Sequence, residues 1–332
     1  MDFLIGSLTR LGGPGIARVR LQDETLTCLW TDPQLTDPNW LSLGPQGHVF
    51  AASSDMPSPL RGCVNEMAVE ATGLRVLRRR STAGQAPCHL AFGRSTLLAA
   101  NYGTGSLAVF PLGEDGLEER IQLIEHQGRG PDPQRQLSPH VHQITAIPLL
   151  PHCFCATDLG TDSLVVYREE DRLLQELYRF TTPAGEGPRH IVHGAHGRSW
   201  LLTEMGSRLF PVFFDGDRGA LGKGVSTLDA PLENTAAAIR LSPDEEHLYV
   251  SNRGAGNIVR FDAHTLRRVE AMPVAGRLPR DFVLLPRNRI LAACQDQGLT
   301  LLKNGRIMDT LPMPGAVCVL PYDVDRAPLP SL

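Results

Sequence analysis

Histidine, arginine and glutamate occur in two segments whose spacing suits acid–base chemistry on a small anion. His140 and His142 are two residues apart, so both would point to one face of a strand. An ordinary histidine titrates near pH ~6.5 and can take a proton from water at neutral pH. Arg189 precedes Glu204 by about the length of one hairpin, and arginine binds carboxylate or phosphate through parallel hydrogen bonds. The residues therefore suggest a general base, a carboxylate and an anion-binding arginine.

Each of these pairs has another interpretation. The two histidines could instead bind a metal, or one could cap a loop while the other is solvated. No cysteine or carboxylate accompanies them at ligand spacing, which disfavours the metal. Arg189 and Glu204 could form a surface ion pair of little energetic value. Arg280 and Asp281 could equally form an internal salt bridge that orients the arginine.

A repeated strand–turn–strand pattern must position these residues. One copy runs through the apolar segment 97–100, the turn 101–105 and the apolar segment 106–110. The residues that precede successive copies, His89, His140 and His190, are 51 and 50 positions apart, and later intervals shorten to the mid-forties. A period of 40–50 residues with about four strands per unit is typical of a β-propeller.

Six internal units begin near residues 39, 87, 139, 188, 235 and 279. A seventh must be shared between the ends of the chain. Residues 314–320 resemble an innermost strand with nothing after it, and residues 3–7 resemble a second strand with nothing before it. Pairing them would close the ring and remove exposed edges. The prediction is an all-β, seven-bladed propeller that forms a single domain over residues 1–332.

In such a ring, each innermost strand begins beside the end of the second strand, so two sets of side chains meet at one mouth. The first set comprises His89, His140, His142, Arg189, His190, Arg280 and Asp281. The second comprises Ser7, Asp55, Asn101, Asp158, Glu204, Asn252, Arg253 and Gln295. From these two sets we predict the residues of a site. The predicted catalytic residues are His142, His140, Glu204 and Arg189. The predicted substrate-binding residues are Arg253, His190, Asn101, Arg280 and Asn252. Asn and Asp at second-strand ends could also simply make turns.

Composition excludes several classes of protein. A hydrophobic content of 42% with 20% charged residues excludes a disordered chain, and a net charge of -4 gives no sign of nucleic-acid binding. The chain shows no basic leader and no apolar run long enough for a membrane helix. Seven irregularly spaced cysteines do not suggest a disulfide framework. We therefore expect a cytoplasmic protein, a monomer or weak homodimer, that binds neither membranes nor nucleic acid.

Seven motifs in order at blade spacing resemble those of the seven-bladed propeller lactonases, which include 6-phosphogluconolactonases and 3-carboxy-cis,cis-muconate lactonising enzymes. They are Ala100-Asn101-Tyr102, Pro139-His140-x-His142, Asp158-Leu159-Gly160, Gly187-Pro188-Arg189-His190, Leu241-Ser242-Pro243-Asp244, Ser251-Asn252-Arg253 and Pro279-Arg280-Asp281-Phe282. The resemblance places the family's histidine on His140 or His142, its arginines on Arg189 and Arg253, and its glutamate on Glu204. This chain has Thr203-Glu204 where the family usually has Asn-Glu, and the blade around Cys63 matches poorly.

The resemblance implies hydrolysis of a sugar lactone, with 6-phosphogluconolactone of the pentose phosphate pathway as the leading candidate and no metal or cofactor. His142 or His140 would be the general base, Glu204 would orient it, and Arg189 and Arg253 would hold the phosphate and the developing oxyanion. The alternatives are a cycloisomerase acting on a carboxylated muconate and a non-enzymatic scaffold. A separation of more than about 10 Å between His142, Arg189 and Glu204 would favour the scaffold.

Overall fold

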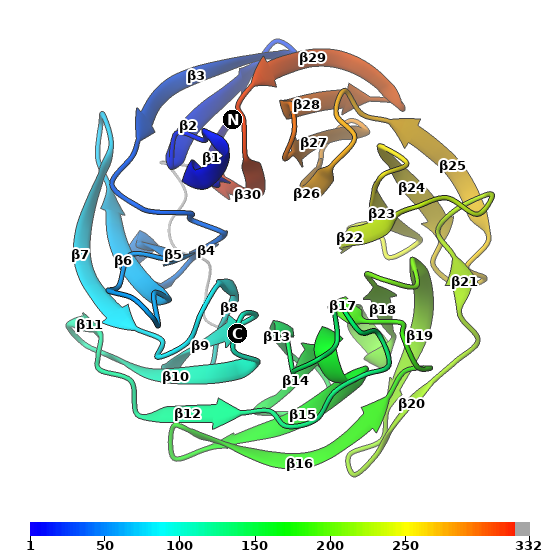
Figure 1. Ribbon diagram of the computed structural model, residues 1–332. Coiled ribbons are helices and arrows are strands. Elements are labelled where there is room, and N and C mark those ends of the chain that lie inside the picture. The colour runs from blue at the N-terminus through cyan, green and yellow to red at the C-terminus, as the bar shows by residue number, and fades with distance from the viewer. Residues whose placement is uncertain (323–332) are drawn as a thin grey trace.

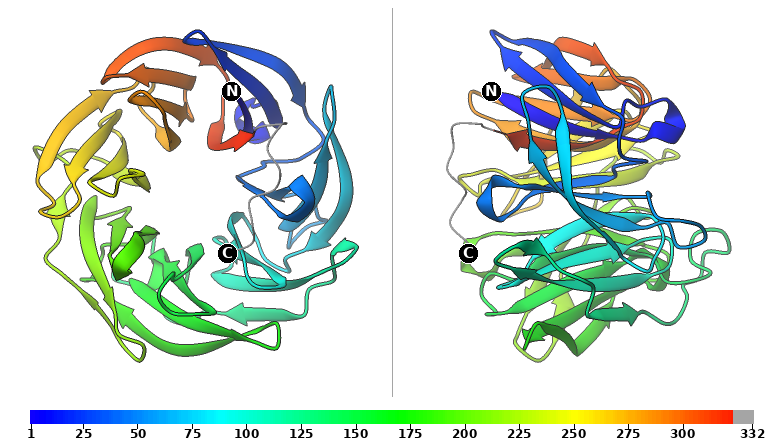
Figure 2. Two further views of the ribbon diagram at one scale, coloured as in Figure 1. Left: turned by 180° about the vertical axis from the view of Figure 1, so that it is seen from behind. Right: turned by 90° about the vertical axis from the view of Figure 1, so that its left-hand side faces the viewer.

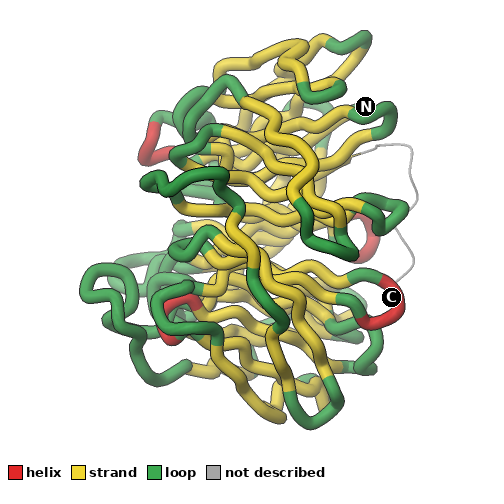
Figure 3. The backbone as a smooth tube through the Cα atoms, turned by 90° about the vertical axis from the view of Figure 1, so that its right-hand side faces the viewer, coloured by secondary structure: helices red, strands yellow, loops and turns green. Residues whose placement is uncertain are grey.

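The repeating unit is an antiparallel sheet of four strands, or of five where the outermost strand is split in two. The computed structural model describes residues 1–322. In this part of the chain, seven such sheets are arranged in a ring around a central channel (Figure 1). The view from behind shows the same ring (Figure 2). The short 3-10 turns lie in the loops between strands (Figure 3). The predicted fold class is confirmed.

The inner half of each blade faces the central channel. The innermost strands are β4 (Trp40–Leu43), β8 (Pro87–Phe92), β13 (Val141–Ala146), β17 (Pro188–His193), β22 (Thr235–Leu241), β26 (Pro279–Leu285) and β30 (Ala316–Tyr322). The second strands are β5 (Val49–Ser53), β9 (Thr96–Asn101), β14 (Cys153–Asp158), β18 (Ser199–Thr203), β23 (His247–Arg253), β27 (Arg289–Cys294) and β1 (Asp2–Ser7).

The outer half of each blade is more solvent-exposed. The third strands are β6 (Cys63–Val69), β10 (Ser106–Gly113), β15 (Ser163–Glu170), β19 (Arg208–Phe214), β24 (Asn257–Asp262), β28 (Gly298–Lys303) and β2 (Ile16–Gln22). The outermost strands are β7 (Leu74–Ser81), β11 (Gly116–Leu117) with β12 (Gln122–Glu125), β16 (Leu173–Thr181), β20 (Gly219–Leu221) with β21 (Val225–Ser226), β25 (Arg268–Pro273), β29 (Arg306–Pro312) and β3 (Thr25–Asp32). The 3-10 turns are η1 (Thr9–Leu11), η2 (Pro45–Gly47), η3 (Leu159–Thr161) and η4 (Ala195–Gly197).

The two ends of the chain close the ring in one blade, as predicted. β1 pairs antiparallel with β30, so the C-terminal strand is innermost and the N-terminal segment supplies the other three strands. Leu4 lies opposite Leu320, and Ile5 opposite Val319. This pairing covers the edge of β1, which would otherwise end its sheet without an innermost strand. Residues 323–332 of the predicted domain lie outside the described part.

The hydrophobic core lies between the blades rather than within one sheet. Each buried cluster joins the facing surfaces of two neighbouring blades, as Leu98 and Val109 meet Ile144 and Val165. Seven such clusters connect the ring. Strand β9 is buried along its whole length because it is covered on both faces. The apolar strands of neighbouring blades therefore make the contacts that hold the ring together.

Register shifts lie near the beginnings of six innermost strands, and in four of them the bulge inserts a single cysteine, histidine or arginine. In these four, the pairing register shifts between Pro87 and His89, between Val141 and Gln143, and at the equivalent points of β17 and β26. The extra residue in each of the four strands is Cys88, His142, Arg189 or Arg280. A bulge breaks the regular alternation of side chains and re-aims the inserted residue. All four inserted residues lie together at one mouth of the channel.

In residues 1–322, no helix has both the length and the apolar character that crossing a membrane requires.

Candidate active site

Glu204 is the centre of the polar cluster at this mouth. It follows β18 directly and is almost completely buried. Its Oε2 atom lies 3.0 Å from Arg189 Nε and 2.8 Å from a terminal nitrogen of Arg253, and its Oε1 atom lies 2.6 Å from a terminal nitrogen of Arg135. Burial raises the pKa of this carboxyl, but the surrounding arginines outweigh it and hold the pKa well below its usual value. Glu204 is therefore ionised at neutral pH.

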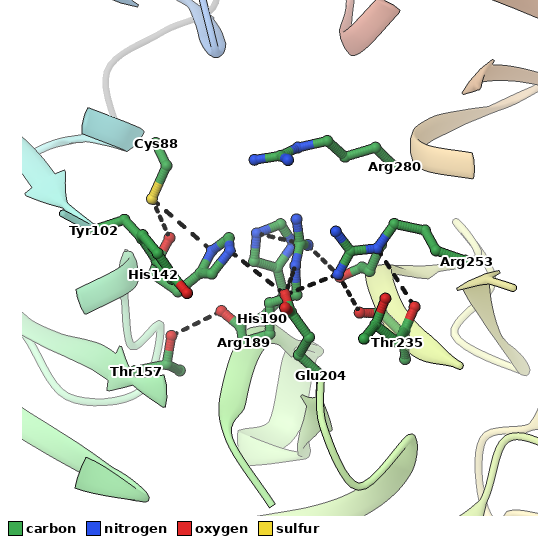
Figure 4. A network of polar contacts seen from close by, with 12 residues as sticks. Cys88, Tyr102, His142, Thr157, Arg189, His190, Glu204, Thr235, Arg253 and Arg280 are labelled. Atoms are coloured by element: carbon green, nitrogen blue, oxygen red, sulfur yellow. Dashed lines mark hydrogen bonds and ion pairs between the residues drawn. The ribbon is translucent and has the colours of Figure 1, made fainter. Parts of the chain in front are cut away.

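His142 lies beside this carboxylate. Its Nε2 atom is 3.8 Å from Glu204 Oε2, and its other ring nitrogen faces the sulfur of Cys88 at 3.9 Å (Figure 4). Burial and the charge of Arg189 lower its pKa well below 6.5, although Glu204 opposes the shift. His142 is therefore neutral at pH 7 and able to accept a proton.

A cavity of about 200 Å³ opens in front of these groups. This is smaller than the ~300–1,000 Å³ of pockets for drug-sized ligands, so it suits a small metabolite. Its lining comprises Arg10, Asn39, Ala86, Cys88, Tyr102, Arg135, His142, Glu204, Arg253 and Arg280. Four guanidinium groups line it in the described residues, but Arg10 is already paired with Asp37, so Arg135, Arg253 and Arg280 face the single lining carboxylate of Glu204. Cys88 stays a thiol because burial raises its pKa to about 12. The cavity carries an excess of positive charge.

Arg280 accounts for much of this excess. It extends from β26 toward the same centre as Arg253 and His142 (Figure 4). One terminal nitrogen donates to Asn39 Oδ1 at 3.2 Å, and no carboxylate of residues 1–322 lies within ion-pair distance. The alternative in which Asp281 pairs with Arg280 is wrong, because Asp281 binds Arg240 and the amide of Val319 instead. Burial and the charge of Arg253 lower the pKa of Arg280, as expected for an uncompensated cation.

Arg189 lies behind Glu204 instead of on the cavity wall. Its guanidinium donates to Glu204 and to the carbonyl of Ala237, and it contacts the ring of His190. Burial and the nearby Arg253 lower its pKa to about 9. The predicted hairpin between Arg189 and Glu204 is confirmed by the pairing of β17 with β18. The geometry gives Arg189 the role of positioning Glu204, and Thr157 fixes the backbone by donating to the Arg189 carbonyl.

The two histidines do not share one strand face. β13 begins at Val141, and the bulge at His142 separates the directions of the two rings. His142 lines the cavity, whereas His140 stacks on Tyr102 with ring centroids 4.6 Å apart and contacts the Tyr102 carbonyl through its ring nitrogen. His140 therefore lies behind Tyr102, outside the cavity that His142 and Glu204 line.

Three further predicted residues lie outside the cavity lining. Asn101 donates to Ser106 within its blade turn, and Asn252 contacts Thr227 and Asn257. Both are buried turn residues, which agrees with the alternative interpretation of second-strand ends. His190 packs below His142 in the channel, with ring centroids 5.3 Å apart.

The structure adds residues that the sequence argument missed. Arg135 and Tyr102 form a wall of the cavity, and Arg135 donates to the Tyr102 hydroxyl at 3.1 Å. Cys88 stands at a bulge, Asn39 holds Arg280, and Arg10 reaches in from η1. Position in the repeat could have indicated Cys88 and Asn39, because both occur at the starts of repeat units. Arg135 lies in a loop, where the strand repeat gives no information.

Three buried histidines lie on the innermost strands beneath the site, and we expect them to make the fold less stable in acid. His89, His142 and His190 all have lowered pKa values, chiefly through burial, and that of His89 falls to about 3. Below pH 6.5 the unfolded chain takes up protons that the folded chain does not. Each histidine should then cost up to about 1.4 kcal/mol of unfolding free energy per pH unit. Denaturant titrations at pH 7.0 and 5.5 should show a lower midpoint at pH 5.5, and a smaller drop for His89→Gln. Equal midpoints would contradict this.

In the described part of the chain, no group of three or more His, Cys, Asp or Glu side chains is arranged to hold a metal ion.

Comparisons with known proteins agree on one family. The model of the family described as "Lactonase, 7-bladed beta-propeller" matches residues 2–302. A 6-phosphogluconolactonase of Bacillus subtilis is 26% identical over 339 residues, with 96% of each chain covered. A solved structure of a putative 6-phosphogluconolactonase from Bacteroides uniformis has a TM-score of 0.86 at 29% identity, covering 96% of this chain and 98% of that one. A periplasmic gluconolactonase of Pseudomonas aeruginosa has a TM-score of 0.86 at 25% identity, covering 97% and 99%.

Proposed function

The chain belongs to the family of seven-bladed β-propeller lactonases, and we propose that its reaction is hydrolysis of 6-phosphogluconolactone to 6-phosphogluconate. One relative carries the name of this activity, and another is named a gluconolactonase. The observation that supports the phosphorylated substrate is the charge of the cavity, in which Arg135, Arg253 and Arg280 face the single carboxylate of Glu204, while Arg10 is paired with Asp37. A dianionic phosphate compensates this excess, whereas a neutral sugar does not.

The reaction begins with water between His142 and Glu204. A water that hydrogen-bonds to both groups at about 2.8 Å fits between atoms that are 3.8 Å apart. His142 Nε2 accepts its proton as the oxygen attacks the lactone carbonyl, and Glu204 stabilises the resulting imidazolium. The ring carbon–oxygen bond then breaks, and the proton on His142 passes to the departing ring oxygen. The products are a hydroxyl group and a carboxylic acid that ionises.

The arginines divide the remaining tasks by position. Arg253 is held by the carbonyls of Thr235 and Ala236, so its guanidinium is fixed beside the reacting groups. We assign it to the charge that develops on the carbonyl oxygen. Arg280 is assigned to the phosphate because its charge is uncompensated within residues 1–322. Arg189 keeps Glu204 in place. The scaffold alternative requires His142, Arg189 and Glu204 to lie more than about 10 Å apart. Glu204 lies within 4 Å of each of the other two, so this distance criterion does not favour the scaffold.

Arg280→Met should raise KM for 6-phosphogluconolactone roughly 10- to 100-fold, the scale of a lost charge-assisted hydrogen bond. The kcat should change little because Arg280 does not touch the reacting bond. Steady-state kinetics test this, with Arg277→Met as the matched control, since Arg277 is exposed in the preceding turn of the same blade. An unchanged KM in Arg280→Met would remove Arg280 from phosphate binding.

The proposed reaction is tested by following the loss of 6-phosphogluconolactone by ³¹P NMR, with the uncatalysed rate subtracted. Acceleration supports the proposal. No acceleration, together with turnover of a carboxylated muconate, would select the cycloisomerase, which needs the same arginines for carboxylates. We propose the cytoplasm as the compartment, because the charge of a phosphorylated substrate retains it inside the cell.

A further inference from the structure

Arg135 differs from the other two arginines that bind Glu204. Arg189 and Arg253 come from the bulge of β17 and the end of β23, and their side chains are 2% and 12% exposed. Both also donate to backbone carbonyls of β22, so their positions are fixed by the blades. The Arg135 side chain is 38% exposed and comes from the long loop between β12 and β13. Its other contact is the hydroxyl of Tyr102.

The loop that carries Arg135 is itself held firmly. Asp158 accepts hydrogen bonds at both ends of the loop, from the ring of His126 at 2.9 Å and from the amide of His140 at 2.8 Å. Gln136 donates to the carbonyl of Leu159 at 2.8 Å. A side chain at Gly160 would meet the Ser138 carbonyl at 2.0 Å, so the loop packs directly against η3. The loop therefore presents Arg135 from a fixed base.

We propose that Arg135 selects the phosphorylated substrate by transferring its guanidinium from Glu204 to the phosphate. This inference rests on the proposed hydrolysis of a phosphorylated lactone. In the structure, one terminal nitrogen of Arg135 donates to both Glu204 and Tyr102, while the other two guanidinium nitrogens make no hydrogen bond within residues 1–322, and the residue lines the cavity. A phosphate offers a dianion and several acceptors, so it competes with a single carboxylate oxygen for this partly exposed guanidinium.

The transfer also changes Glu204. Arg135 is one of the charges that lower the pKa of this carboxyl. When the guanidinium moves away, Glu204 keeps Arg189 and Arg253 on Oε2 but loses its partner on Oε1. Its interaction with a protonated His142 then becomes stronger, because less of its charge is already neutralised. Phosphate binding thereby prepares the carboxylate for the proton transfer, and a lactone without phosphate leaves Arg135 on Glu204.

The experiment compares Arg135→Met with the wild-type protein on 6-phosphogluconolactone and on glucono-lactone. The ratio of the two kcat/KM values, phosphorylated over unphosphorylated, should fall roughly 10- to 100-fold, because only the phosphorylated substrate loses a contact. A merely structural role would lower both values by the same factor and leave the ratio unchanged, which would overturn the inference. Arg129→Met is the matched control, since Arg129 is an exposed arginine in the same loop.

Titration with inorganic phosphate separates failure of this inference from failure of the proposed function. If the wild-type protein hydrolyses neither lactone, the proposed function is wrong, but calorimetry can still measure phosphate binding. Phosphate should then bind Arg135→Met at least about 10-fold more weakly than the wild type or Arg129→Met. Equal phosphate affinity in Arg135→Met and the wild type would overturn the role of Arg135 whatever the lactone results are.

Discussion

Glu204→Gln should abolish nearly all lactone hydrolysis and lower the free energy of unfolding by about 3–5 kcal/mol, the scale of breaking a buried ion pair. Three guanidinium groups share this carboxylate, and two of them are largely buried. An amide is isosteric but neutral, so it leaves these charges uncompensated and cannot stabilise a protonated His142. Initial rates and denaturant unfolding of the purified variant measure the two effects.

Glu66→Gln is the matched control for this experiment. Glu66 is also buried and also binds charged partners, Arg78 and His48, but it lies on β6, away from the cavity. We expect it to lose stability while kcat/KM at a temperature well below its unfolding transition stays near the wild-type value. Wild-type activity in Glu204→Gln would refute the assigned role of this carboxylate.

His142→Ala should lower kcat by about 100-fold or more, which is the scale of a lost general base, while the ring of blades stays folded. Because burial and Arg189 lower the pKa of His142, the wild-type enzyme should keep its activity as the pH falls through 6.5. Its acid limb should begin only where His142 is protonated, below that value. A pH profile of kcat/KM measures this limb.

Two other histidine variants separate the base from its neighbours. His140→Ala should cost less than about 10-fold, because the His140 ring stacks on Tyr102 and does not line the cavity. His193→Ala is the control, since His193 lies at the far end of β17. A larger loss in His140→Ala than in His142→Ala would exchange the two roles.

Local patterns in the sequence predict the ring and its closure. Apolar runs and turns repeat at blade spacing, and the seven interblade clusters explain why such runs are enough to build the core. The terminal segments of the sequence are predicted to be an innermost strand and a second strand, each without its partner in the adjoining sequence. They correspond to β30 and β1, which pair with each other. The same topology correctly brings His142, Arg189, Glu204, Arg253 and Arg280 to one mouth.

The roles of these residues at the mouth depend on features that alternation does not encode. Bulges re-aim His142 and Arg280, and the same device places Cys88 on the cavity wall. Arg189 is covered by the chain around it, so a residue predicted to touch the phosphate lies behind Glu204. Arg135 approaches Glu204 across 69 residues of sequence, from a loop whose path is set by tertiary contacts.

The most direct test of the proposed function is the ratio of kcat/KM for 6-phosphogluconolactone to that for glucono-lactone, measured on the wild-type protein at pH 7. The arginine-lined cavity predicts a ratio of at least about 10, since the phosphate gains one or more charge-assisted hydrogen bonds. A ratio near one, or faster turnover of the unphosphorylated lactone, would contradict the assignment of this cavity to a phosphorylated sugar lactone.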